Sequence, residues 1–512
     1  MSAPARLLAA LLAGLAQAVS IATPWSGEPL WWLQLAALAV LARLVLAAPG
    51  WRAAALLGWV FAVAWLAGTF WWLYISLHTY GGLAAPLAVA AVLALALALG
   101  SYYALVCACF RALALDGKAL TAPVFAALWL LAELARGQWW TGFPWGAGGY
   151  AHVDGPLAAF APLVGVYGIA ALATWLAMAL AQWRAAALLR RRWWVGVAVT
   201  VLVWQGAAWQ QRDADAQALV HAPLTLTLLQ GAIPQDEKFQ AGSGVPLALA
   251  WYADRMRQAQ GRLVVAPETA IPLLPQDLPP GYLDALTARY RAGDQALLLG
   301  LPLGNAAAGY TNAVWGFAPG QGEPYRYDKH HLVPFGEFIP PLFRWFTDLL
   351  RIPLGDFNRG ALRQPSFAFA GERIAPNICY EDLFGEELAA RFADAASAPT
   401  LLVNLSNIGW FGDTVAIDQH LAISRMRALE LRRPMVRATN TGATAVIDHT
   451  GRVRARLAPF ERAALDAQVR GVQGSVTPYA WWAARWGLVP LWALALALVL
   501  YAAVRRCRRD NG

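Results

Sequence analysis

The sequence predicts a membrane α-helical bundle of about eight spans joined to one layered α/β domain. Two observations predict this fold class. Long apolar runs occur between residues 7 and 209 and again at 480–504, whereas residues 210–477 have the composition of a soluble domain in which strand-like and helix-like segments alternate. The 512-residue chain is 59% hydrophobic and only 14% charged, against about 25% charged residues in soluble proteins.

Eight apolar runs are candidates for membrane spans. A helix needs about 17 or more residues to cross a bilayer core, and every run except the fifth is near or above that length. The first run follows Arg6 and could pass for a signal peptide, but further runs follow at once, so we expect it to be a first span. The runs cover residues 7–21, 30–48, 53–75, 83–110, 122–134, 157–181, 193–209 and 480–504.

Basic residues predict the orientation of these spans. Arg43, Arg52, Arg111 and Lys118, the arginines at 190–192 and those at 505–509 all fall on one side if the N-terminus is cytoplasmic. We therefore expect a seven-span bundle at 1–209, a domain at 210–477 that faces the periplasm of a bacterial inner membrane, and a last span with a basic cytoplasmic tail at 478–512. The basic tail and loops also account for the net charge of +9 without a nucleic-acid partner.

Strands and helices alternate in the 210–477 segment, which is the pattern of a layered α/β domain. The expected strands are 224–229, 262–266, 296–301, 313–317, 373–378, 400–404, 434–439 and 443–447, and the expected helices are 247–260, 282–291, 382–392 and 418–433.

Cys379 lies where the strand 373–378 runs into the helix-like segment that follows. The positive end of a helix dipole favours a thiolate, so this is a suitable place for a nucleophile. The other interpretation is a small core residue, because free cysteine is among the most buried residue types. The remaining cysteines, Cys107, Cys109 and Cys507, lie in apolar runs or the basic tail. Their spacing predicts neither disulfides nor a metal site, and we expect no cofactor.

Two further ionisable residues follow apolar strands in this domain. Glu268 comes after the strand 262–266 and its proline, and Lys329 lies in a loop that also contains Glu337. A thiol needs a base, which Glu268 could supply, and acyl transfer places negative charge on a carbonyl oxygen, which Lys329 could stabilise. Taken singly, these residues could instead be a surface carboxylate and a solvated lysine paired with Glu337.

The set Pro267-Glu268, Lys329 and Cys379-Tyr380-Glu381 resembles the Glu-Lys-Cys triad of the nitrilase superfamily. With eight predicted spans, the chain is similar over nearly its whole length to the apolipoprotein N-acyltransferase family. The similarity includes the Phe-Pro-Trp loop at 143–145, the Pro-Glu-Thr-Ala-Ile-Pro run at 267–272, the His-Leu-Val-Pro-Phe-Gly-Glu run at 331–337 and the Arg-Ala-Thr-Asn-Thr-Gly run at 437–442. The resemblance implies an α-β-β-α sandwich for the α/β domain.

The resemblance also implies roles for individual residues. Cys379 would be the nucleophile, Glu268 the general base and Lys329 the oxyanion stabiliser, while Glu337, Tyr380 and Glu381 would support them. Relatives carry tryptophan where this chain has Phe239 and often an acidic residue where it has Ile408. Both departures concern the substrate side of the site. The residues implied to contact substrate are Phe239, Phe338, Phe343, Trp345, Phe143, Trp145 and Trp410.

Two aromatic segments have alternative interpretations. The loop containing Phe143 and Trp145 is either an interfacial anchor or the lining of a lipid entrance. The apolar stretch 338–346, continued by Leu349 and Leu350, is either an amphipathic surface helix or a membrane-facing lid over the site.

The implied reaction is a ping-pong acyl transfer by a monomer in the bilayer. The thiol would take an acyl chain from a phospholipid, phosphatidylethanolamine in the family, and pass it to the N-terminal amine of a diacylglyceryl apolipoprotein. One alternative is a membrane-tethered amidase, which would use water and would have no need of eight spans. Another is a transporter or scaffold, for which Glu133 and Arg136 in the fifth run would mark a pathway.

Overall fold

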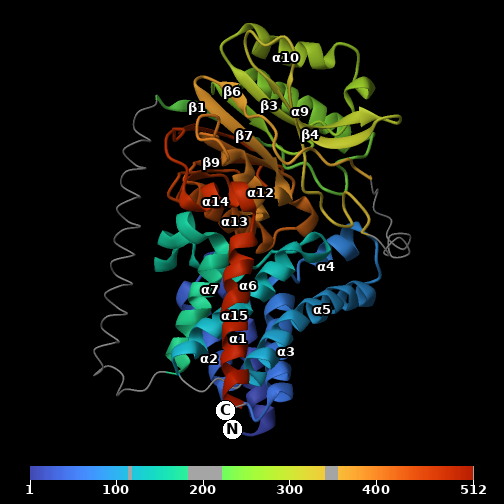
Figure 1. The fold of residues 1–512 in the computed structure, drawn as a ribbon. Helices are drawn as coiled ribbons and strands as arrows, with labels where there is room; N and C mark the ends of the chain where they lie inside the picture. Colours follow the sequence, from blue (N-terminus) through green and yellow to red (C-terminus); the bar gives the residue numbers. More distant parts are fainter. Residues whose placement is uncertain (114–117, 183–221, 341–355, 511–512) are drawn as a thin grey trace. The chain divides into compact units, whose positions relative to one another are not determined.

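The computed structural model describes residues 1–113, 118–182, 222–340 and 356–510. The described residues form two compact units (Figure 1). The helical unit comprises residues 1–71, 86–113, 118–182 and 486–510, and the α/β unit comprises residues 72–85, 222–340 and 356–485. The seventh predicted span at 193–209 and the predicted domain limit at 209 lie outside the described residues.

The helical unit confirms a multi-pass membrane protein. Among the described residues, six helices are long and apolar enough to cross a membrane, and α2 is a shorter apolar helix. Seven of the eight predicted runs therefore coincide with helices. The helices are α1 (Ala3–Ile21), α2 (Trp31–Leu46), α3 (Trp51–Thr69), α5 (Ala85–Ala112), α6 (Lys118–Gln138), α7 (Ala161–Ala181) and α15 (Val489–Asp510).

Three predicted span limits were wrong. The fifth run is not short, because α6 has 21 residues and includes polar residues on both sides of the apolar stretch. The third run ends at Thr69 rather than residue 75, and the residues beyond it form α4 (Leu73–Ile75) and the π-helical turn η1 (Ser76–Tyr80) of the α/β unit. The last run is broken at Gly487, whose φ of +54° ends α14 (Pro478–Trp486) before α15 begins.

Glu133 and Arg136 form a buried ion pair rather than a solitary intramembrane charge. The guanidinium of Arg136 donates to Glu133 Oε2 at 3.1 Å and to the hydroxyl of Tyr103 at 3.0 Å. It also donates to the carbonyl oxygens of Phe143 and Trp145, both at 2.8 Å. The pair thus anchors the 143–145 loop to α6, and this structural role removes the reason to see a transport pathway here.

The α/β unit contains two six-stranded sheets. The first has the order β12-β1-β2-β3-β4-β5 and the second β11-β10-β9-β8-β7-β6. The three strands β1, β2 and β3 run parallel in the first sheet, as do β7, β8 and β9 in the second. The other strands of each sheet pair antiparallel with their neighbours. The strands of the first sheet are β1 (Leu224–Gln230), β2 (Leu263–Ala266), β3 (Ala296–Asn305), β4 (Gly309–Phe317), β5 (Tyr325–Asp328) and β12 (Ala463–Val469). Those of the second are β6 (Phe367–Phe369), β7 (Glu372–Ile378), β8 (Leu401–Ser406), β9 (Met435–Thr439), β10 (Ala445–Ile447) and β11 (Val453–Arg456).

The two sheets pack face to face through a core of branched apolar residues. Leu226, Val265 and Leu298 of the first sheet belong to the same buried cluster as Ile378 and Val403 of the second. A second cluster joins the first sheet to α9 (Gly244–Gln258) and α10 (Tyr282–Ala292). On the other side of the sandwich, α12 (Gly385–Ala389) and α13 (Ala416–Leu431) follow strands of the second sheet (Figure 1). The predicted α-β-β-α sandwich is therefore confirmed.

Candidate active site

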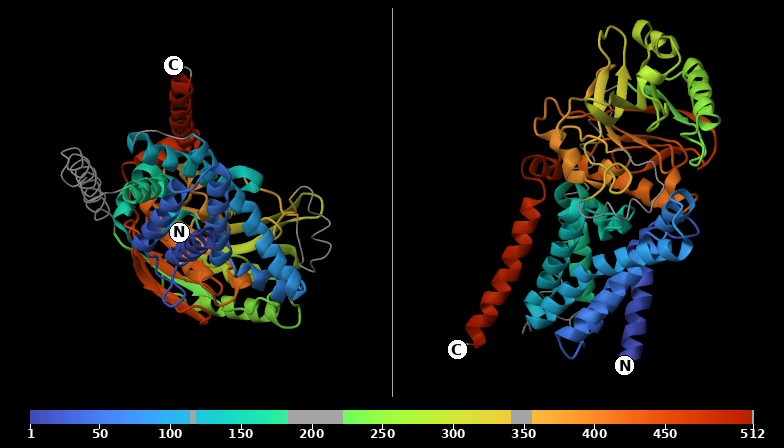
Figure 2. Two further views of the ribbon diagram at one scale, coloured as in Figure 1. Left: turned by 90° about the horizontal axis from the view of Figure 1, so that it is seen from below. Right: turned by 90° about the vertical axis from the view of Figure 1, so that its right-hand side faces the viewer.

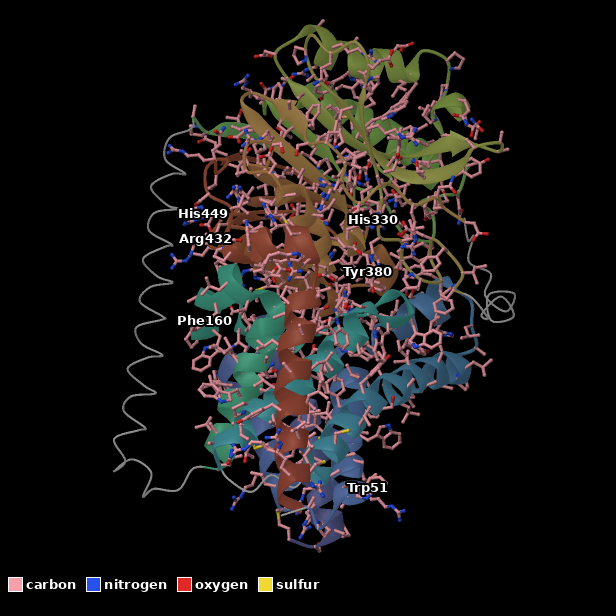
Figure 3. The ribbon with its side chains drawn as sticks, in the orientation of Figure 1. Trp51, Phe160, His330, Tyr380, Arg432 and His449 are labelled. Carbon is pink, nitrogen blue, oxygen red and sulfur yellow. The ribbon has the colours of Figure 1, made fainter. Side chains whose placement is uncertain are left out.

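Glu268, Lys329 and Cys379 each lie just beyond the end of a strand. Glu268 follows β2 and Pro267, Lys329 follows β5 directly, and Cys379 follows β7. Tyr380, beside Cys379, and His330, beside Lys329, lie in the same part of the unit (Figure 3). The structure therefore brings together the three residues that the sequence indicated, although 61 and 50 positions of chain separate successive members.

The Glu268 carboxylate is buried and fully hydrogen bonded. Its Oε1 accepts from Lys329 Nζ at 3.3 Å and from Asn312 Nδ2 at 2.7 Å, and its Oε2 accepts from the backbone N–H of Asn407 at 2.8 Å. Burial raises the pKa of Glu268, but Lys329, Asn312 and Lys238 together hold it below its ordinary value. Glu268 is thus ionised at neutral pH, as a general base must be.

Lys329 bridges two carboxylates. Its Nζ donates to Glu337 Oε1 at 2.9 Å as well as to Glu268, and Asn312 Nδ2 reaches the same Glu337 oxygen at 2.8 Å. The backbone N–H of Val333 donates to Glu337 Oε2 at 2.8 Å. Burial alone would lower the pKa of Lys329, but Glu337 and Glu268 raise it well above its ordinary value, so the ammonium stays charged. Glu337 therefore fixes the position of the cation.

The backbone of Cys379 has a φ of +52°, in the left-handed region that residues other than glycine rarely adopt. A backbone strained in this way persists only because the surrounding structure holds it, and such residues are common in active sites. Burial, reinforced by the charge of Glu268, raises the pKa of this thiol to about 12 despite the opposing effect of Lys329. The expectation of a dipole-favoured thiolate was wrong, because only the five-residue 3₁₀ turn η7 (Cys379–Leu383) follows. The thiol stays protonated and needs a base.

Glu381 ties the Lys329 loop to the Cys379 turn. Its carboxylate accepts from the backbone N–H groups of Ile378 at 2.6 Å, His330 at 2.6 Å and His331 at 3.2 Å. The hydroxyl of Tyr327 also donates to both of its oxygens, at 2.8 and 2.9 Å. Removing this carboxylate would free the loop from the turn, so Glu381 positions the lysine against the thiol.

A second buried network lies beneath the Cys379 turn. Asp382 accepts from Arg437 NH1 at 3.2 Å and from His420 Nε2 at 2.9 Å, and the Ser424 hydroxyl also donates to it. Arg437 NH2 lies 3.0 Å from His420 Nδ1, which therefore accepts and leaves the proton on Nε2. Burial lowers the pKa of His420, in keeping with a neutral ring. The network fixes the base of the turn.

The predicted substrate-contact residues differ in exposure. Phe239 is 49% exposed and directly follows the buried Lys238. Trp410 is partly buried and its ring lies 5.8 Å from that of Tyr80, while Phe338 is partly buried with the Arg359 guanidinium 5.0 Å from its ring. In the helical unit, Phe143 is partly buried and Trp145 is only 3% exposed. Phe343, Trp345 and the rest of the predicted lid from residue 341 lie outside the described residues.

Sequence reasoning missed Asn312, Asn407 and Lys238, all of which contact Glu268. Asn312 lies within β4, in a run where an amide interrupts apolar residues, and Asn407 directly follows β8. A polar residue inside an apolar strand was the available signal for Asn312. The backbone contact of Asn407 leaves no signal in the sequence.

Comparisons with known proteins cover both units. Residues 13–179 match the family model described as apolipoprotein N-acyltransferase N-terminal domain, and residues 225–475 match the model for carbon-nitrogen hydrolase. The chain is 60% identical over 498 residues to an apolipoprotein N-acyltransferase of Verminephrobacter eiseniae (strain EF01-2), which covers 94% of this chain and 92% of the relative. It is 49% identical over 484 residues to one of Ralstonia nicotianae, covering 94% of this chain and 90% of the relative. A solved carbon-nitrogen hydrolase from Helicobacter pylori G27 has a TM-score of 0.37 and 18% identity, covering 49% of this chain and 90% of that chain.

Proposed function

The chain belongs to the apolipoprotein N-acyltransferase family of the nitrilase superfamily, and we propose that it works through a thioester on Cys379. The family N-acylates lipoproteins in the membrane, with a phospholipid as donor. Cys379 is the nucleophile of the proposed mechanism, Glu268 the general base and Lys329 the oxyanion stabiliser. The observation that carries the proposal is the buried ion pair between Lys329 Nζ and Glu268 Oε1 at 3.3 Å, whose two charges both act on the Cys379 thiol.

In the first half-reaction the Cys379 sulfur attacks an ester carbonyl carbon of the donor. Glu268 takes the thiol proton during the attack, because a thiol with a pKa of about 12 is not ionised beforehand. The carbonyl oxygen becomes an oxyanion stabilised by Lys329. When the carbon–oxygen ester bond breaks, Glu268 returns the proton to the glycerol oxygen, and lysophospholipid leaves the thioester behind.

In the second half-reaction the N-terminal amine of the diacylglyceryl-cysteine attacks the thioester carbon. Glu268 takes a proton from the amine nitrogen and delivers it to the Cys379 sulfur as the carbon–sulfur bond breaks. The product is an amide and the free thiol is restored. Glu337, Tyr380 and Glu381 support both steps by holding Lys329 and the thiol in register.

The finer substrate assignments belong to the same proposal. We infer phosphatidylethanolamine as the donor and a monomer as the working form. Both substrates keep their acyl chains in the bilayer, since exposing each methylene to water would cost about 0.8 kcal/mol. Phe239, Trp410 and Phe338 would form the wall beside the site, Phe143 and Trp145 the lipid entrance, and Phe343 and Trp345 the lid.

We also propose a cytoplasmic N-terminus and a periplasmic catalytic domain, in three domains at 1–209, 210–477 and 478–512. Three arginines support the orientation because they lie at one end of the helical unit. Arg6 bonds the carbonyl of Ala47, Arg43 that of Ala181 and Arg111 that of Ala48. Both chain termini lie at one end of the helical unit (Figures 1 and 2), as a cytoplasmic basic tail requires.

The experiment that tests the function is N-acylation of a diacylglyceryl-cysteinyl peptide in vesicles that contain the purified protein and phosphatidylethanolamine. We expect a triacylated peptide and lysophospholipid in equal amounts, and neither with Cys379→Ala. Lys329→Met should also yield neither product, because the oxyanion loses its cation. Lys118→Met, which removes the lysine at the start of α6, is its matched control. An amide product that forms equally well with Cys379→Ala would overturn the assignment.

The orientation has its own test. A green fluorescent protein fused after Gly512 should fluoresce in bacterial cells, whereas an alkaline phosphatase fused at the same place should be inactive. Active phosphatase and a dark fluorescent fusion would place the tail in the periplasm and reverse the orientation.

A further inference from the structure

A second lysine lies against the proposed catalytic base. Lys238 belongs to the turn after β1, where the Pro234 carbonyl accepts from the backbone N–H groups of Glu237 and Lys238. The side chain is 2% exposed, and its Nζ donates to the backbone carbonyl oxygen of Glu268 at 3.2 Å. Within the described ranges this oxygen is the single acceptor for an ammonium that carries three N–H groups. No step of the mechanism above uses it.

Lysine is a rare residue in this chain. Lys118, Lys238 and Lys329 are the three lysines among 40 basic residues, so arginine is the ordinary cation of this protein. Two of the three lie against Glu268. Lysine differs from arginine in being a compact point charge that can lose its proton when buried. A lysine at 238 therefore gives this part of the protein a cation whose charge can be lost as the pH rises.

Charge counting shows what a second cation would do. Glu268 and Glu337 are two carboxylates facing the single ammonium of Lys329, so this buried cluster by itself has one net negative charge. A net charge held away from water is costly. Adding the Lys238 ammonium makes the four groups neutral. Transfer of the thiol proton to Glu268 leaves the net charge of these four groups and Cys379 together unchanged, because the proton moves within this set of five.

We propose that Lys238 is a positioning residue of the acyl-transfer centre. Its positive charge keeps Glu268 ionised and lowers the free energy of forming the oxyanion in a buried site. The role rests on the proposed thioester mechanism. Lys238 acts through Glu268, whose backbone it also holds, and it need not contact the substrate. Without it, the oxyanion would form in a cluster that already carries an excess negative charge.

The titration of the cluster gives a distinctive readout. Burial lowers the pKa of Lys238 to about 8, although Glu268 and Cys379 both act to raise it. The thiol, with a pKa of about 12, and Lys329, whose pKa is raised, keep their protons at pH 8, while Glu268 is already ionised. The turn of Lys238 also carries the acidic residues Asp236 and Glu237. The charge of Asp236 adds to the effect of burial in raising the pKa of Tyr80. Above about pH 8 the loss of the Lys238 proton restores the excess negative charge, so acyl transfer to Cys379 should slow.

The test measures lysophospholipid release in a single turnover, without acceptor, from pH 6 to 10. The wild-type rate should fall above about pH 8 and level off roughly tenfold lower, near the rate of Lys238→Met, because both then have a neutral side chain at 238. Lys238→Met should be roughly tenfold slower at pH 7 and should lack this fall. Lys238→Arg, which keeps its charge at every pH, should retain most of the rate at pH 7 and stay active at pH 9. Gln240→Met, an exposed change in the same turn, is the matched control and should behave as wild type.

Each outcome decides the question. A Lys238→Met rate equal to wild type, an unchanged fall near pH 8 in Lys238→Arg, or Lys238→Arg as slow as Lys238→Met would each overturn the counter-charge role. If Lys238→Met does not fold, the comparison of wild type with Lys238→Arg decides alone. Absence of lysophospholipid from the wild type itself would instead contradict the proposed thioester function.

Discussion

Asn312 offers the sharpest test of how the base is held. Its Nδ2 gives one hydrogen to Glu268 Oε1 at 2.7 Å and the other to Glu337 Oε1 at 2.8 Å, so one amide holds two carboxylates together. Hydrogen bonds to charged groups contribute about 1.5 to 3 kcal/mol each. In Asn312→Leu both carboxylates retain their bonds to Lys329, and Glu268 retains its bond from the Asn407 backbone N–H. We therefore take the lower value for each of the two lost bonds and expect the free energy of unfolding to fall by about 3 kcal/mol.

The same change should slow the chemistry. Without the amide, the Glu268 carboxylate can turn toward Lys329 and away from the thiol, and a misplacement of about 1 Å costs about a hundredfold in rate. The assay is the single-turnover rate of lysophospholipid release, with thermal unfolding in detergent as the measure of stability. Thr311→Val is the matched control. Thr311 is the neighbour of Asn312 on β4, and the change removes its hydrogen bond to Asp328 of β5. A rate for Asn312→Leu within about threefold of wild type would refute the reasoning.

Three further predictions follow from the contacts described. Glu268→Gln should lower the thioester-forming rate by about 10² to 10⁴ without loss of folding, and a rate near wild type would exclude Glu268 as the base. The pKa of Glu268 is held below its ordinary value of 4.5, so its ionised form and the stability that this form contributes are present above that pH and lost as the pH falls further. Lysophospholipid release at pH 5 should therefore match that at pH 7. A decline centred above pH 5 would contradict this. Asp382→Asn should destabilise the protein by about 3 to 5 kcal/mol, because the buried charge of Arg437 loses its partner, whereas an unchanged unfolding midpoint would show that the network is dispensable.

The fold was largely predictable because hydrophobic patterning is a local property. All eight strands expected at 224–447 were confirmed within a few residues, as were the helices that became α9, α10 and α13. The expected helix at 382–392 is instead divided into η7, α12 and η8 (Ala390–Phe392). Strands β5, β6, β11 and β12 were missed. These strands are short, or charged residues alternate with apolar ones within them. β12 forms because it pairs with the edge of β1, and a contact of this kind leaves no pattern in the local sequence.

The site was predictable where chemistry and strand ends coincide. Glu268 and Cys379 each follow a predicted apolar strand, whereas Lys329 lies among polar residues after the missed strand β5. The structure brings the three together. The Lys238 contact is tertiary, since the turn after β1 meets Glu268 after β2 only when these two strands pair. The pKa of Cys379 was also beyond the sequence, because it depends on burial and on the distance to two carboxylates. The roles of all these residues stay predictions until variants are measured.

Intact-protein mass spectrometry after incubation with phospholipid and no acceptor would detect the proposed thioester on Cys379 itself. We expect a mass increase of one fatty acyl chain on the wild type that hydroxylamine removes. The chain should pass to a diacylglyceryl-cysteinyl peptide when that peptide is added, and the increase should be absent from Cys379→Ala. An unmodified wild type in the presence of released lysophospholipid, or the same adduct on Cys379→Ala, would contradict the proposed thioester.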